Sequence, residues 1–444
     1  MAVGDVAARP GVRRARGRLS GVVAQLTVAN ALAAATGFIT GPLLARALGA
    51  SGRGNLQAII VPLSVAPFVL SLGITAFVYR TLPRGRPVEE VIPSLGAPLL
   101  LLGLIAAAAG VPVADALVGG REPMRTFLII GFVLTPVVLL IMLLSSSLAA
   151  LERWRAVVAM SVIPFAVPFV AIVGLAATGR LTVATAATAT MLGSLLGIVP
   201  GLPLLISIRR PVFRLSLAWE SVVFGLKSWL GGLAQLANGR LDQVLMIALV
   251  PPRQLGLYAV ATTISGASGP LAGAVSPPLM ARVGAGERHL MPQAVRMTVA
   301  VTVVLNLGVA LVTPILLPLL FGASFRAATP MAMVLLAASV PLAGASVLST
   351  GLQADGVPLI PSIGEGIALV VTVVGLVLLL PPLQAMGAAI VSLAAYSASF
   401  LFQLLMAKRR IGTPLSAFLL PSRADLLWLI RRITDLTPRF GAER

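Results

Sequence analysis

Long runs without a single charged residue constrain this chain more than any other feature. Only 11% of its 444 residues are charged and 58% are hydrophobic, a balance unlike that of a soluble domain. About 20 apolar residues in a helix cross the hydrocarbon core of a bilayer, so each run is long enough to span a membrane. The nine uninterrupted runs are 19–45, 54–79, 91–114, 126–151, 156–179, 181–208, 254–281, 297–325 and 327–354.

Two further stretches complete the set of spans. The run 366–407 is long enough for two helices and contains Pro381 and Pro382, where a break is expected. The stretch 224–250 is apolar apart from a few polar and charged residues. We therefore predict an all-α polytopic membrane protein with twelve transmembrane helices. We expect the first run, 19–45, to be a retained helix, because it is too long for the apolar region of a cleaved signal peptide.

The positive charge of the chain fits a membrane protein. The formal net charge is +19, and most of the 33 Lys and Arg residues lie between the predicted spans. Placing both termini in the cytoplasm puts the larger share of these residues on the cytoplasmic side, as the positive-inside rule requires. We therefore expect a multi-pass protein of the cytoplasmic (inner) membrane with both termini cytoplasmic. The charge needs no nucleic-acid partner to explain it.

The residue inventory excludes several kinds of chemistry. The chain has no Cys, and His289 is its only His, in a predicted loop. A His/Cys metal cluster is therefore impossible, and nothing favours a Ser-His-Asp triad. Neither lysine lies in a Gly-rich phosphate-binding loop. We expect no enzyme, no cofactor and no metal, and transport would have to be downhill or coupled to H⁺ or Na⁺.

A central polar interruption, 209–227, divides the chain into six spans and six spans. Shifting the second half back by 201 residues aligns a few identities and a similar polar pattern. An even number of spans per half gives both halves the same orientation, so we predict two parallel six-helix lobes with a central cavity. The expected parts are a basic cytoplasmic tail (1–18), an N-lobe (19–208), a cytoplasmic linker (209–223), a C-lobe (224–408) and a cytoplasmic tail (409–444) with an amphipathic helix at 422–436.

A polar stripe in the seventh span is the best candidate for a cavity lining. On a helical wheel Gln235, Asn238 and Asp242 fall on one face, and Thr27 and Asn30 lie on the matching face of the first span. Packing between helices is the competing explanation for the small and hydroxyl residues. A cavity is favoured for Asn238 and Asp242, because a carboxylate against lipid is costly.

Three more ionisable residues have two or more open interpretations each. Arg240 is about 200° around the helix from Asp242, so it pairs with another span, reaches the membrane surface or faces a second wet surface. Glu365 either completes a capping box at the start of its span or faces the cavity. Arg80 is either a cytoplasmic anchor or an entrance residue for an anionic head group. Asp242 and Glu365 are the candidates for ion coupling.

Two short strings resemble a known family. The segments R-L-D-Q (Arg240–Gln243) and L-G-L-Y-A-V-A (Leu255–Ala261) are similar to bacterial polysaccharide flippases of the multidrug/oligosaccharidyl-lipid/polysaccharide exporter superfamily. The resemblance implies an alternating-access transporter that moves an undecaprenyl-pyrophosphate-linked oligosaccharide to the outer leaflet for cell-surface polysaccharide synthesis. It implies a lipid-linked oligosaccharide substrate, membrane lipid and polysaccharide assembly proteins as partners, with Arg240 contacting the pyrophosphate.

Two alternatives remain open. A multidrug or cation antiporter of the same superfamily would need an acidic, aromatic cavity, and only 5% of the residues are aromatic. A membrane glycosyltransferase or polymerase would need catalytic acids on a sizeable external loop, and every predicted external loop is short. The basic loop motif of major-facilitator transporters is not matched after the second span.

Overall fold

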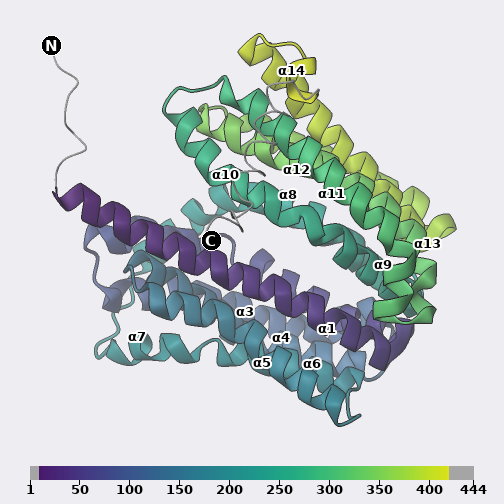
Figure 1. Cartoon of the computed structure of the whole chain (residues 1–444). Helices are drawn as coiled ribbons and strands as arrows, with labels where there is room; N and C mark the ends of the chain where they lie inside the picture. Colours follow the sequence, from purple (N-terminus) through teal and green to yellow (C-terminus); the bar gives the residue numbers. More distant parts are fainter. Residues whose placement is uncertain (1–9, 420–444) are drawn as a thin grey trace, which may run out of the picture. The chain divides into compact units, whose positions relative to one another are not determined.

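The chain folds almost entirely into helices, and the part that the structure describes contains no strand (Figure 1). The structure is a computed structural model that describes the backbone of residues 10–419. It also describes their side chains, apart from those of residues 10–31, 33–34, 228, 230–232 and 234–235. The prediction of an all-α fold is confirmed.

The first half of the chain forms seven α-helices and three short 3₁₀ turns. They are α1 (Pro10–Leu70), η1 (Ile74–Phe77), α2 (Val78–Thr81), η2 (Leu82–Arg84), α3 (Val88–Val118), α4 (Met124–Ala150), α5 (Trp154–Ala177), α6 (Val183–Leu196), η3 (Val199–Gly201) and α7 (Leu202–Ser207).

The second half forms seven more α-helices and two 3₁₀ turns. They are α8 (Leu215–Leu249), α9 (Pro252–Ser265), η4 (Gly266–Ser268), α10 (Gly269–Gly284), α11 (Leu290–Phe321), η5 (Ala323–Ala328), α12 (Thr329–Ala354), α13 (Leu359–Ile411) and α14 (Ser416–Leu419).

The two longest helices are each divided by one residue with a non-helical backbone. Gly49 has φ 65° and ψ −179° inside α1, a conformation that glycine adopts without a Cβ clash. Gln384 has φ 49° and ψ −130° inside α13, shortly after Pro381 and Pro382. A proline removes a backbone hydrogen bond and clashes with the preceding turn, so the break predicted at this proline pair is confirmed in position to within a few residues.

Eight of the described helices are long and apolar enough to cross a membrane. Helix α8 is not in this set, and α9 and α10, separated by η4, are each shorter than 18 residues. Dividing α1 at Gly49 and α13 at Gln384, and counting α8 and the α9–α10 segment, gives helical segments at all twelve predicted spans. The chain is a multi-pass membrane protein. The eight helices are Ala35–Leu70, Val88–Val118, Met124–Ala150, Trp154–Ala177, Val183–Ser207, Leu290–Phe321, Ala323–Ala354 and Leu359–Ile411.

The two longest helices extend past the predicted spans 19–45 and 366–407. Helix α1 already includes Pro10, the first residue that the structure describes. Helix α13 continues to Ile411 and ends at Gly412, whose φ of 75° provides a left-handed cap. The amphipathic helix expected at 422–436 lies outside the described residues.

The chain divides into two compact units. The N-terminal unit comprises the residues up to Leu236 together with Gln243–Gly256 and Leu320–Ser324, and the C-terminal unit comprises Ala237–Asp242, Leu257–Leu319 and the residues from Phe325 on. Each unit has its own apolar core, one around Leu95 and Leu143 and the other around Val347 and Leu348. The predicted lobes 19–208 and 224–408, with the linker 209–223, stay a prediction.

Close helix packing in the N-terminal unit relies on small residues. A Cβ added to Gly103 on α3 would lie 2.7 Å from Pro136 Cα on α4, and one added to Gly110 would lie 2.9 Å from Phe132 Cβ. Without a hydrophobic driving force between helices in lipid, such close contact supplies the dispersion energy that holds them together.

Candidate functional site

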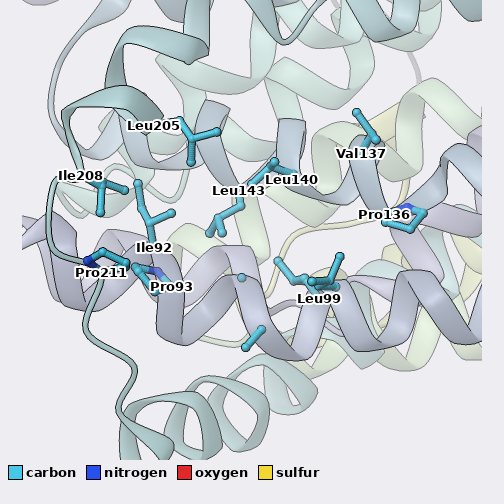
Figure 2. Close-up of a pocket in the computed structure, with 13 residues that line it drawn as sticks. Ile92, Pro93, Leu99, Pro136, Val137, Leu140, Leu143, Leu205, Ile208 and Pro211 are labelled. Carbon is cyan, nitrogen blue, oxygen red and sulfur yellow. The ribbon is translucent and has the colours of Figure 1, made fainter.

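One large pocket of the N-terminal unit is lined almost wholly by apolar side chains. It encloses ≈ 520 Å³ between α3, α4 and the segment that follows α7. Figure 2 shows Ile92 and Leu99 on one side of this pocket and Leu140 and Leu143 on another. A binding site needs a few polar groups to orient its ligand, and this lining is almost wholly apolar, so the polar site must be sought elsewhere.

A cluster of polar side chains inside the C-terminal unit is the candidate functional site. It joins α8, α9 and both halves of α13. Each member lies in a helix at one of the predicted spans. The cluster forms where polar positions of these helices pack against one another. Its members are Asn238, Asp242, Tyr258, Glu365, Ser392 and Tyr396.

Asn238 and Glu365 are joined by a direct hydrogen bond. The side-chain Nδ2 of Asn238 donates to Glu365 Oε2 at 2.7 Å and to the Glu365 backbone carbonyl at 3.0 Å. Asn238 is buried and Glu365 is half-buried. Two bonds from one amide to one residue fix the side of α13 that faces α8.

The proposed capping role of Glu365 is excluded by this geometry. Helix α13 begins at Leu359, with Pro358 as its N-cap, so Glu365 lies in the second turn. The hydroxyl of Ser362 donates to the Pro358 carbonyl at 3.0 Å and caps no helix end. The other interpretation, that Glu365 faces a cavity, stays a prediction.

Asp242 is buried and accepts a short hydrogen bond from the hydroxyl of Tyr258. The same hydroxyl lies 3.3 Å from Ser392 Oγ, and Ser392 in turn donates to the Ala388 carbonyl at 3.0 Å. Tyr258 is completely buried and Asp242 is 7% exposed. A carboxylate in such a place must be held by hydrogen bonds or carry a proton, because burial without either is very costly.

Tyr396 completes the cluster from the second half of α13. Its hydroxyl donates to the Asn238 backbone carbonyl at 3.3 Å. The Oδ1 atom of Asn238 is buried and has no hydrogen-bond partner among the described residues. The cluster therefore presents two acids, hydroxyls and one spare carbonyl oxygen, which are the hard oxygen donors that a proton or a small alkali cation needs.

Arg240 lies on the other side of α8 from this cluster. Its side chain is exposed, whereas Asn238 and Asp242 are buried, so the geometric separation predicted from the helical wheel is confirmed. Arg240 makes no hydrogen bond or ion pair with any described residue. The partner on another span that we considered for Arg240 is absent from the part of the chain that the structure describes.

Two other arginines of the N-terminal unit have different surroundings. Arg80 lies in the short helix α2, with its guanidinium 5.5 Å from the Phe224 ring centre. Arg46 donates from Nε to the Leu320 carbonyl at 2.9 Å, so it binds the end of α11. The side chains of Thr27, Asn30 and Gln235 lie outside the described residues.

Sequence reasoning missed three members of the cluster: Tyr258, Ser392 and Tyr396. Tyr258 and Tyr396 are two of only three tyrosines in the chain, and each lies in an apolar helix. A buried tyrosine hydroxyl usually has a hydrogen-bond partner, so these two tyrosines could have indicated a polar contact between apolar helices. Ser392 had none, because serine is common at helix-packing positions in membranes.

Comparisons with solved structures identify the fold. The chain is similar to the lipid II flippase MurJ in an inward closed conformation, with a TM-score of 0.72, 13% identity and 92% of each chain covered. It is similar to an inward-facing multidrug resistance MATE family transporter of the MOP superfamily, with a TM-score of 0.71, 16% identity and coverage of 88% of this chain and 98% of the other. It is also similar to the MATE multidrug transporter DinF-BH, with a TM-score of 0.62, 14% identity and coverage of 94% and 99%.

No protein-family model matches the sequence, and no curated protein matches it either. The likeness is therefore one of fold. The chain has the fold that this flippase and these transporters share.

Proposed function

We propose that the chain is an alternating-access flippase that moves an undecaprenyl-pyrophosphate-linked oligosaccharide across the cytoplasmic membrane for cell-surface polysaccharide synthesis. The observation that carries this proposal is Arg240, an exposed cation without a described partner in the middle of a predicted span. An arginine inside a membrane marks a substrate path, and its planar fork suits a pyrophosphate. Asn238, Gln235, Thr27, Asn30 and Arg80 are proposed as further contacts of the substrate path.

The similarity to a lipid II flippase over 92% of the chain supports the proposal of a flippase, since the name of that protein states that it moves a lipid. In this proposal the protein lies in the inner membrane with both termini cytoplasmic, performs no catalysis of its own, and receives its substrate from polysaccharide assembly proteins.

The buried cluster of the C-terminal unit is proposed as the coupling site. Asp242 and Glu365 would carry a proton, or hold Na⁺ together with the free Oδ1 of Asn238. Arg240 lies on the other side of α8 from these acids, whereas Asn238 belongs to both proposed sites, so substrate and ion would both contact this helix. Movement of α8 would then link the two events.

A multidrug or cation antiporter is the second candidate function. Two carboxylates inside the C-terminal unit and the fold of the MATE transporters favour it. The two functions differ in where the acids act: an antiporter would present them to a cationic drug, whereas both acids here are hydrogen-bonded inside one unit.

Reconstitution into liposomes tests the proposal. The purified chain should move a fluorescent undecaprenyl-pyrophosphate-linked sugar between leaflets, as measured by access of a membrane-impermeant quencher, and should not accumulate a cationic rhodamine dye. Arg240→Gln should reduce flipping by about tenfold or more, because an arginine–phosphate pair is a strong charge-assisted contact. The matched control is Arg326→Gln, which removes an exposed arginine of the same unit. Rhodamine transport without sugar-lipid flipping would replace the flippase by the antiporter.

The coupling site has its own test. Na⁺ should raise the unfolding temperature of the purified protein, and Asp242→Asn should remove that response while Glu287→Gln, at an exposed ion pair, should keep it. If Asp242→Asn and Glu365→Gln both keep full flipping and an unchanged pH dependence, the coupling role is wrong.

A further inference from the structure

A second pocket of the N-terminal unit is basic. It encloses ≈ 540 Å³ between the end of α2 with the loop that follows it and the first turns of α8. Four cations line it: Arg80, Arg84 and Arg86 from the first segment, and Lys227 from the second. Glu220 is the one acid in its lining.

The positive charge of this basic pocket is not neutralised. None of the four cations forms an ion pair with any described residue, although other loop arginines do. Arg214, a few residues before the pocket wall, is bound to Glu90 at 2.6 Å. Clustered like charges repel one another. An anion that enters the pocket would therefore gain favourable contacts with cations that form no ion pair with a described residue.

The guanidinium of Arg80 is held in place. It lies 5.5 Å above the ring of Phe224, which itself packs against Phe77 with ring centres 5.4 Å apart. A cation over an aromatic face loses part of its freedom before any ligand arrives. The pocket thus offers one preorganised arginine beside two more exposed ones, an arrangement suited to phosphate oxygens.

Aromatic residues place the basic pocket at the depth of lipid headgroups. Trp219 lines it and is 68% exposed, and Tyr79, next to Arg80, is 54% exposed. Exposed Trp and Tyr side chains concentrate at the membrane–water interface. Leu217 and Val223 form an apolar part of the same wall, so a ligand here would contact charge and hydrocarbon together. Both features favour an amphiphile over a soluble anion.

We propose that this basic pocket binds the phosphate headgroup of an anionic membrane lipid. The phosphate would lie among Arg80, Arg84 and Lys227, and the lipid tail would extend from the apolar wall into the bilayer. Basic pockets between transmembrane helices on the cytoplasmic side bind such headgroups through this combination of forces. This site shares Arg80 with the proposed substrate path, but it concerns the binding of a membrane lipid and requires no movement of that lipid.

Trp219 makes the site measurable. The full chain is reconstituted in phosphatidylcholine that contains a small, equal fraction of either brominated phosphatidylglycerol or brominated phosphatidylcholine. The Trp219 signal is obtained by subtracting the emission of Trp219→Phe in the same lipids. Bromine quenches tryptophan on contact, so the expected result is stronger quenching of Trp219 by the anionic lipid.

Charge-removing variants identify the cause of that preference. The triple variant Arg80→Gln, Arg84→Gln, Lys227→Gln should lower the preference for phosphatidylglycerol by about tenfold or more, since each cation near the surface contributes about fivefold. The control triple variant removes three exposed arginines from other segments of the same unit and should stay within about twofold. Its substitutions are Arg153→Gln, Arg155→Gln and Arg209→Gln.

Three outcomes would overturn the proposal. The first is equal quenching of Trp219 by both brominated lipids, and the second is an equal preference in the two triple variants. The third is loss of the quenching when millimolar pyrophosphate is added at constant ionic strength, which would assign the pocket to a soluble anion. If the pocket triple variant fails to fold, Arg84→Gln alone is measured, with an expected loss of about fivefold.

Discussion

Removing one oxygen atom from Tyr258 tests the structure of the intramembrane cluster. Tyr258→Phe keeps the ring, which is completely buried, and deletes the hydroxyl that donates to Asp242. The substitution removes a single atom and leaves the volume of the ring unchanged, so the fold should survive. The hydroxyl also lies 3.3 Å from Ser392 Oγ, but that serine retains its bond to the Ala388 carbonyl. The variant therefore isolates the contact between tyrosine and carboxylate.

The expected loss of stability follows from the type of bond. A hydrogen bond to a charged group contributes about 1.5–3 kcal/mol, and a neutral one about 0.5–1.5 kcal/mol. Because both groups are at most 7% exposed, water does not replace the lost donor. We expect Tyr258→Phe to lower the free energy of unfolding by about 2 kcal/mol, measured by reversible unfolding in mixed micelles.

A matched variant and a double variant make this expectation refutable. Tyr79→Phe deletes the same atom from a tyrosine that is 54% exposed, and should change the free energy of unfolding by no more than about 0.5 kcal/mol. In an Asp242→Asn background, Tyr258→Phe should cost only the value of a neutral bond, about 1 kcal/mol. If Tyr258→Phe and Tyr79→Phe behave alike, or if the background makes no difference, Asp242 is not held as a charged group by Tyr258.

Two further predictions concern packing and surface charge. A Cβ at Gly54 would overlap the carbonyl oxygen of Pro252, so Gly54→Ala should destabilise the protein by about 1–3 kcal/mol in thermal unfolding, whereas Gly37→Ala, with no atom within 4 Å of its added Cβ, should not. The ion pair between Arg125 and Asp115 is solvent-exposed, so Asp115→Asn should leave the unfolding temperature unchanged at high salt; a clear loss there would show that the pair is structural.

The sequence predicts the helices well because the lipid imposes a simple rule on them. A charge-free run of sufficient length has no stable alternative to a helix in a bilayer, since every backbone polar group must be satisfied internally. The same periodicity correctly separated Asp242 from Arg240, because both lie on one regular helix. The pair Pro381–Pro382 marked a break for an equally local reason.

The composition of the cluster could not be predicted in the same way. Whether Glu365 binds Asn238 or caps its own helix depends on where α13 begins, and helix ends are set by capping and packing. The contact between Tyr258 and Ser392 joins helices 134 positions apart in the chain. Periodicity indicates which face of a helix is polar, but the partner of that face is decided by tertiary packing.

Two close contacts explain why the internal similarity of the sequence is weak and still meaningful. A Cβ at Gly54 would overlap the Pro252 carbonyl oxygen, and a Cβ at Gly256 would overlap the Ala50 carbonyl oxygen. Ala50 and Pro252 therefore correspond, as do Gly54 and Gly256, and each pair is 202 positions apart, one more than the alignment of the sequence suggests. Such a reciprocal contact is what a local twofold relation between the turn after the first span and the turn after the seventh produces. This contact requires glycine at position 54 in α1 and at position 256 in α9. The two halves can therefore keep this relation while nearly all their other side chains differ.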